Sequence, residues 1–180
     1  MKEMNKPLVT LIIFAYKAEQ FIAETIDGAL NQTYENLEVI ISDDASSDNT
    51  SKVIQDVVGK YKGNKRVAVN INKQNMGIVP HMTKLFNMAN GDIIATNPGD
   101  DISTPNRISD TVDYFCNDSN LQMVTFSRKD INEDNIEIGG NCVKEDKYFR
   151  LNDKYFNSPN IMFGGTAVAF RKICYLCLDL

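Results

Sequence analysis

The sequence is poor in the residues and patterns that mark several protein classes. Cysteine occurs four times in 180 residues, histidine occurs once, and tryptophan is absent. The cysteines are scattered and follow no secretory leader, so we do not expect a disulfide scaffold. Cys174 and Cys177 form a C-x-x-C pair, but no second pair stands at metal-ligand spacing. We interpret them as apolar positions on one helix face.

Long apolar runs are also missing. No stretch approaches the roughly 20 apolar residues that a membrane-spanning helix needs. The start, MKEMNKPLVT, lacks the apolar core of a signal peptide. We therefore expect a cytoplasmic chain, with membrane association only through segments outside this sequence.

Positive charge is scarce relative to negative charge. The chain has 19 Lys and Arg against 24 Asp and Glu, which gives a net charge of -5. Such a chain has no general attraction for nucleic acid or for an anionic membrane. A phosphate-bearing ligand would need a local helix N-terminus, an arginine or a metal ion. Neither G-x-G-x-x-G after the first strand nor G-x-x-x-x-G-K-[ST] is present, which disfavours a classical dinucleotide site and a phosphate-loop NTPase.

What the sequence does contain is a regular alternation of strand and helix patterns. Apolar runs predict strands at 8–15, 37–42, 66–71, 92–96 and 121–127. Helical spacing and turn signals predict helices at 19–31, 48–60, 80–89 and 105–116. This order predicts one α/β domain over 1–180, with a mostly parallel sheet flanked by helices.

The pattern changes after residue 128. Polar residues at 129–160 predict a hairpin excursion, and GGTAVAF at 164–170 predicts a further strand. The last eight residues are mostly apolar and carry no cap or turn signal, so we expect the chain to be part of a longer protein.

Acidic residues gather where three predicted strands end. The first strand ends in Ala15 and Tyr16, the second in Asp43 and Asp44, and Asp100-Asp101 follow the fourth. Parallel strands place these ends on one edge, where ligands of open α/β sheets bind. Four clustered carboxylates repel one another, and a divalent cation, magnesium or manganese, would compensate them and take further ligands from substrate phosphates.

An ordered set of motifs resembles family-2 glycosyltransferases, which have the GT-A fold. It comprises the opening PLVTLIIFAYK, the Q-[ST]-[FY] turn at 32–34, D-D-x-S-x-D-x-T at 43–50, N-x-G at 75–77 with Gly91-Asp92, D-D-x-x-x-P-x-R at 100–107, and GGTAVAFRK at 164–172. The resemblance implies inverting transfer of a sugar from a nucleoside diphosphate to a saccharide or lipid-linked acceptor hydroxyl. It also implies a nucleotide-binding part at 7–128 and the start of an acceptor part at 129–180.

The resemblance also implies site residues. Ala15 and Tyr16 would line the nucleoside pocket, and Asp44 would accept the N–H of the base, typically uracil, with Asp43 beside it. Asp100 would contact the donor diphosphate through a manganese or magnesium ion, with Asp101 supporting that ion.

Two departures from the family pattern leave alternatives open. Pro98 stands where the first aspartate of the usual D-x-D metal motif belongs. The family's catalytic base follows the 164–170 strand by some tens of residues, beyond Leu180, so we assign no base. A domain that binds nucleotide-sugar without turnover is therefore the alternative function. A phospho-acceptor regulatory domain is disfavoured, because the third strand ends in Asn70-Ile71-Asn72 without an acid.

Simpler roles also remain open for individual residues. Asp43 and Asp44 could cap the second helix, and Asp100-Asp101 could form an ordinary turn. Arg107 could pair with a neighbouring acid. His81 could contact phosphate, but a surface or hydrogen-bonded neutral histidine is favoured.

Overall fold

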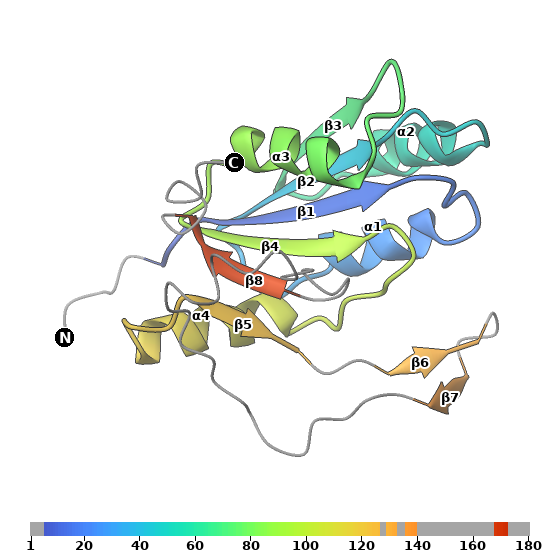
Figure 1. Ribbon diagram of the computed structural model, residues 1–180. Helices are drawn as coiled ribbons and strands as arrows, with labels where there is room; N and C mark the ends of the chain where they lie inside the picture. Colours follow the sequence, from blue (N-terminus) through green and yellow to red (C-terminus); the bar gives the residue numbers. More distant parts are fainter. Residues whose placement is uncertain (1–5, 127–128, 133–135, 140–167, 173–180) are drawn as a thin grey trace.

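The computed structural model describes residues 6–126, 129–132, 136–139 and 168–172. Most of these residues form one six-stranded sheet and the elements around it (Figure 1). Its strands are β1 (Val9–Ala15), β2 (Leu37–Asp43), β3 (Arg66–Ile71), β4 (Ile93–Pro98), β5 (Met123–Thr125) and β8 (Val168–Arg171). The helices of the described part are α1 (Ile22–Leu30), α2 (Thr50–Lys60), α3 (Ile78–Met88) and α4 (Arg107–Asn117). The short strands β6 (Asp130–Ile131) and β7 (Glu137–Gly139) pair as a separate hairpin.

The strand order of the sheet is β3-β2-β1-β4-β8-β5. The pairs β3–β2, β2–β1 and β1–β4 are parallel, and β8 runs antiparallel to β4 and β5. This topology confirms the predicted α/β class and the mostly parallel sheet. The predicted strand ranges hold within about two residues, except that β5 is shorter and the described part of β8 begins at Val168.

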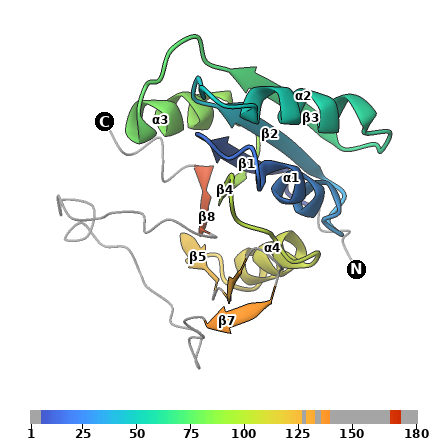
Figure 2. The same ribbon diagram turned by 90° about the vertical axis from the view of Figure 1, so that its right-hand side faces the viewer.

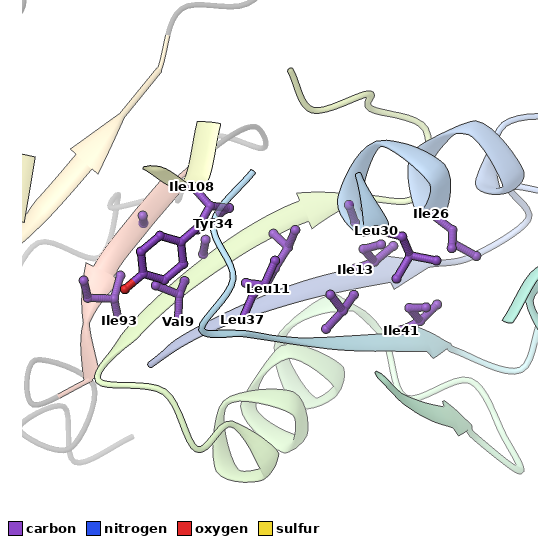
Figure 3. Close-up of a cluster of buried hydrophobic side chains, with 14 of the residues drawn as sticks. Val9, Leu11, Ile13, Ile26, Leu30, Tyr34, Leu37, Ile41, Ile93 and Ile108 are labelled. Carbon is purple, nitrogen blue, oxygen red and sulfur yellow. The ribbon is translucent and has the colours of Figure 1, made fainter. Parts of the chain in front are cut away.

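The central strands β1, β2 and β4 are buried on both faces of the sheet, which explains why β1 and β2 are continuous apolar runs. On one face, α1, α2 and α4 pack over a core that includes Leu11, Ile13 and Ile41. Figure 3 shows Ile26 and Leu30 of α1 directed towards these strands. On the other face, Leu85 of α3 and Ala89, directly after α3, join a second core with Ile12, Ile40 and Ile94. Figure 2 shows α3 and α1 on opposite sides of the sheet.

Two turn signals of the sequence lie at the end of α3 and at the start of α2. Asn90-Gly91 predicts a left-handed helix end, but among the described glycines only Gly77 has a positive φ, 77°. Gly91 instead allows close approach to β1, because an added Cβ would lie 2.5 Å from the backbone nitrogen of Thr10. A Ser or Asp cap is expected where α2 begins, and Asp48 Oδ1 accepts the Thr50 backbone N–H at 3.1 Å, whereas Asn49 makes no side-chain cap. The Asn49 backbone N–H donates to Glu19 Oε2 at 2.7 Å.

A buried carboxylate, that of Glu38, lies at the edge of the sheet where the parallel strands begin. Glu38 Oε1 accepts hydrogen bonds from Thr10 Oγ1 at 2.5 Å and from the Asn90 backbone nitrogen at 2.7 Å. Burial alone would raise the pKa of Glu38, but the hydrogen bonds from Thr10 and Asn90 outweigh it and hold this pKa below its ordinary value. Glu38 thereby ties the turn between α3 and β4 to the sheet. No helix in the described part of the chain has the length and apolar character to cross a bilayer.

Candidate functional site

The carboxyl ends of β1, β2 and β4 lie side by side, as the sequence predicts. The register pairs Ala15 with Asp43 and Phe14 with Pro98. The Asp44 backbone N–H donates to the Ala15 carbonyl at 2.9 Å, which extends the β1–β2 ladder by one bond. The candidate residues of all three strands are therefore gathered on one edge of the sheet.

The end of β1 combines a small buried residue with an exposed aromatic ring. Ala15 is buried, whereas Tyr16 is 51% exposed, and Lys17 Nζ lies 5.4 Å from the centroid of the Tyr16 ring. A Cβ added to Gly99 would lie only 2.8 Å from Ala15 Cβ. The loop after β4 therefore approaches β1 so closely that both positions need small residues.

Asp43 builds the turn after β2. It is fully buried, and its carboxylate accepts hydrogen bonds from the Ser46 hydroxyl and from the Ser46 backbone N–H, the latter at 3.2 Å. Ser46 Oγ in turn accepts the Lys17 backbone N–H at 2.8 Å. Ala45, inside this turn, has a φ of 57°, the left-handed region that disfavours a side chain. Asp43 thus joins the loop after β1 to the loop after β2, and it does not cap α2.

Asp44 is held by the segment between β3 and α3. Its Oδ1 accepts Asn72 Nδ2 at 2.7 Å, and the backbone N–H groups of Met76 and Gly77 donate to the same carboxylate at 3.0–3.1 Å. The side chain is 3% exposed. Burial alone would raise the pKa of Asp44, but the donors Met76, Asn72 and Gly77 outweigh it and hold this pKa below its ordinary value. Asp44 is therefore an ionised acceptor and does not cap α2 either.

A chain of polar side chains continues from Asp44 to α3. Asn72 Oδ1 accepts Lys84 Nζ at 2.7 Å and Asn70 Nδ2 at 2.9 Å. Asn70 Nδ2 also donates to Ser42 Oγ at 2.7 Å, and Ser42 Oγ lies 2.6 Å from His81 Nε2. Burial lowers the pKa of His81 against the charge of Asp44, so its ring is favoured neutral. Of the alternatives for His81, the structure supports the hydrogen-bonded neutral residue.

The loop after β4 carries Asp100 and Asp101. The Asp100 side chain is exposed and that of Asp101 is half-buried. Thr25 Oγ1 donates to the Gly99 carbonyl at 3.0 Å, and Asn97 Nδ2 donates to the Asp101 carbonyl at 2.7 Å. These contacts from α1 and β4 fix the backbone that presents the two carboxylates at the edge of the sheet.

Arg107 secures the same loop from the first turn of α4. It is 4% exposed and donates to Asn97 Oδ1 at 2.8 Å, Ser103 Oγ at 2.9 Å and the Thr96 carbonyl at 2.7 Å. Burial lowers the pKa of Arg107 to about 10, against the opposing charge of Asp101, so the group stays charged at neutral pH. The expected pairing with a neighbouring acid is therefore one part of its role, and holding the loop through neutral acceptors is the larger part.

Three of the four carboxylates are compensated by the protein itself, unlike what the sequence suggests, and the fourth, Asp100, is exposed. Asp43 and Asp44 receive hydrogen bonds from the protein itself, and the charge of Asp101 is opposed by Arg107. Their mutual repulsion therefore does not by itself require a cation. Within the described ranges, no group of three or more His, Cys, Asp or Glu residues gathers at one point. Asp100 and Asp101 together offer hard oxygen ligands, a set that fits magnesium or manganese when a substrate diphosphate supplies the remaining ligands.

The fold and this edge define an α/β domain of the kind that binds its ligand beyond the carboxyl ends of parallel strands. The chain belongs to glycosyl transferase family 2, whose family model matches residues 10–176. An uncharacterized glycosyltransferase of Haemophilus influenzae is 38% identical over 111 residues, covering 62% of this chain and 33% of the relative. The putative glycosyltransferase EpsE of Bacillus subtilis is 33% identical over 118 residues, covering 66% and 42%. The chain thus spans less than half the length of these relatives.

Solved structures agree with this assignment. The crystal structure of S. aureus TarS in complex with UDP superimposes with a TM-score of 0.72 at 18% identity, over 95% of this chain and 48% of that one. The mannosyltransferase PcManGT from Pyrobaculum calidifontis, in complex with GDP-Man and Mn²⁺, gives a TM-score of 0.62 at 21% identity, over 68% and 36%. At these identities the likeness concerns the fold, and it confirms the GT-A fold. The roles of the individual site residues stay predictions.

Sequence reasoning missed several residues of the site. Asn72 contacts Asp44 directly, Lys84 contacts Asn72, and Thr25 contacts Gly99 beside Asp100, but no site role was predicted for any of the three. One signal was available: Asn70 and Asn72 are two residues apart on a predicted strand, so their polar side chains share one face. Cys142, Cys174 and Cys177 lie outside the described residues, as does most of the 129–160 excursion.

Proposed function

We propose that this chain carries the donor site of an enzyme that moves a sugar from a nucleoside diphosphate, with UDP favoured, to an acceptor hydroxyl with inversion. The observation that carries the proposal is the shared edge: Ala15, Tyr16 and Asp44 lie beside the loop of Asp100 and Asp101 in a family-2 chain. The acceptor is a saccharide or a lipid-linked saccharide. Residues 7–128 form the nucleotide-binding part, residues 129–180 begin the acceptor part, and the enzyme works in the cytoplasm.

The nucleoside end of the donor lies against β1 and β2. The exposed ring of Tyr16 offers a flat apolar surface for the base. An ionised carboxylate has about four acceptor positions, and three N–H groups of the protein already donate to Asp44. One further N–H, from the base, completes that set. Asp43, through its turn, keeps Asp44 in place beside Ala15.

The diphosphate end lies against the loop after β4. Asp100 and Asp101 hold a manganese or magnesium ion, and PcManGT, of the same fold, was solved with Mn²⁺. Such an ion would neutralise charge on the leaving diphosphate. Arg107 and Asn97 keep the two carboxylates at the edge, so the protein's own contribution is to fix their positions before the donor arrives.

Binding without turnover is the second candidate. It is favoured by Pro98, which occupies the position of the usual first aspartate of the metal motif. Release of UDP from a UDP-sugar in the presence of acceptor separates the two candidates, because a binding domain releases none.

Isothermal titration with UDP tests the proposed site. The parent chain should bind UDP with Mn²⁺ present and lose at least about tenfold in affinity with a chelator, because diphosphate charge is then unopposed. D100N should lose about as much with Mn²⁺ present. The matched control D110N changes an exposed aspartate in the first turn of α4 and should bind as the parent does. No UDP binding by the parent, or equal binding by D100N, would contradict the proposal.

A further inference from the structure

Lys84 makes unusual contacts for a lysine. Its side chain is half-buried on α3, and Nζ donates to two amide oxygens, Asn70 Oδ1 at 2.8 Å and Asn72 Oδ1 at 2.7 Å. Both asparagines lie on the face of β3 and its extension that meets α3. Neither asparagine carries charge, so these contacts are not an ion pair, and they cost the lysine part of its hydration.

The ammonium group fixes which way the Asn72 amide points. With Oδ1 facing Lys84, Nδ2 faces Asp44 and donates to Oδ1 of that residue at 2.7 Å. In the flipped amide the NH₂ group would face an ammonium and the carbonyl oxygen would face a carboxylate, two repulsive contacts at hydrogen-bond distance. The cation on α3 and the anion after β2 therefore hold the amide between them in one orientation.

Asn70 strengthens this arrangement. It accepts from Lys84 through Oδ1 and donates through Nδ2 to Asn72 Oδ1 at 2.9 Å and to Ser42 Oγ at 2.7 Å. The two amides are thus aligned in the same sense by one cation, and aligned hydrogen bonds polarise one another. The line of donors ends at Asp44, the predicted acceptor for the base.

We infer that Lys84 is a positioning residue for nucleoside recognition, acting through Asn72 on the carboxylate of Asp44. This inference rests on the proposed function. Lys84 itself does not touch the donor. Lys84 fixes the direction from which Asn72 donates to Asp44. It thereby fixes which acceptor position of the Asp44 carboxylate is left for the base. The simpler alternative is that Lys84 only fastens α3 to β3.

The first measurement needs no ligand. Hydrogen exchange of the Met76 and Gly77 amides, both bonded to Asp44, is followed by NMR in the full 180-residue chain. K84M keeps the alkyl stem and removes the donor, and it should speed exchange of both amides about tenfold. K84R, which restores a cationic donor, should recover part of the protection. The control K60M removes an exposed lysine at the end of α2 and should change neither amide.

The second measurement uses UDP and UDP methylated at N3 of uracil, each with Mn²⁺. The parent should prefer UDP about tenfold or more, since methylation removes the N–H that Asp44 accepts. K84M should bind UDP about tenfold more weakly, bind the methylated compound nearly as the parent does, and so lose the preference. Manganese pyrophosphate, which has no base, should bind K84M and parent equally. A purely fastening role would lower affinity for all three compounds together.

The outcomes separate the two proposals. Unchanged exchange in K84M, or a retained preference for UDP over its methylated form, overturns the role of Lys84 while leaving the donor site intact. Faster exchange in K84M with a parent that binds no UDP overturns the proposed function, and the nucleoside role of Lys84 with it. Faster exchange together with selective loss of the preference supports both.

Discussion

Replacing Arg107 by methionine should destabilise the chain by about 3 kcal/mol. Its buried guanidinium makes three hydrogen bonds of 2.7–2.9 Å, to the Thr96 carbonyl, Asn97 Oδ1 and Ser103 Oγ. Hydrogen bonds of charged groups contribute about 1.5–3 kcal/mol each. The destabilisation expected from losing three such bonds is reduced, because Ser103 still donates to Asn97 Oδ1 at 2.9 Å. It is reduced further because methionine fills the space of the alkyl stem and removes a buried charge.

Urea unfolding monitored by circular dichroism measures this loss. The expected change corresponds to a fall in Tm of about 6–12 °C for a chain of this size. R107K keeps the charge but presents one donor atom in place of a planar fork, so it should lie between the parent and R107M. A loss below about 1 kcal/mol in R107M would mean that the guanidinium does not hold the loop after β4.

Two further predictions concern elements that frame the site. E38Q should lower the free energy of unfolding by about 1–2 kcal/mol at neutral pH, because charge-assisted hydrogen bonds become neutral ones. The pKa of Glu38 is lowered in the folded chain. The stability contributed by its carboxylate is therefore fully present above the unfolded pKa, near 4.5, and is lost as pH falls through the folded pKa. Denaturation series at pH 7 and pH 3 should therefore show a gap between parent and E38Q that narrows at the lower pH, and a constant gap would argue against this. A45G should stabilise the chain by about 0.5 kcal/mol, because a φ of 57° costs a non-glycine residue about 1 kcal/mol. The greater entropy of glycine in the unfolded chain offsets part of this gain. Thermal unfolding measures the change, and a lower Tm in A45G would show that the turn is not strained.

The fold was predictable because its signals are local and strong. β1 and β2 are continuous apolar runs that can be buried only between two layers, and helical spacing marks α3 clearly. Gly91 shows the limit of this reasoning. The sequence reveals a glycine at a helix end, but its reason, contact with Thr10 some 80 residues earlier, exists only in the assembled sheet.

The common position of the candidate residues was predictable from the sequence, and their roles in binding stay predictions. Parallel strands place Ala15, Asp43, Asp44, Asp100 and Asp101 on one edge, and the register of β1, β2 and β4 confirms that placement. The motifs do not reveal how each charge is stabilised. The stabilisation of each charge depends on donors such as the Met76 and Gly77 amides. It also depends on whether an asparagine presents its oxygen or its nitrogen. Neither is encoded locally in the sequence.

Anomalous scattering from manganese, in crystals of this chain grown or soaked with Mn²⁺ and UDP, would locate both the ion and the nucleotide. We expect one manganese peak beside Asp100 and Asp101, with the diphosphate next to it and the uracil ring between Tyr16 and Asp44. Crystals in which UDP is absent from this edge of the sheet, or in which manganese lies away from both carboxylates, would contradict it.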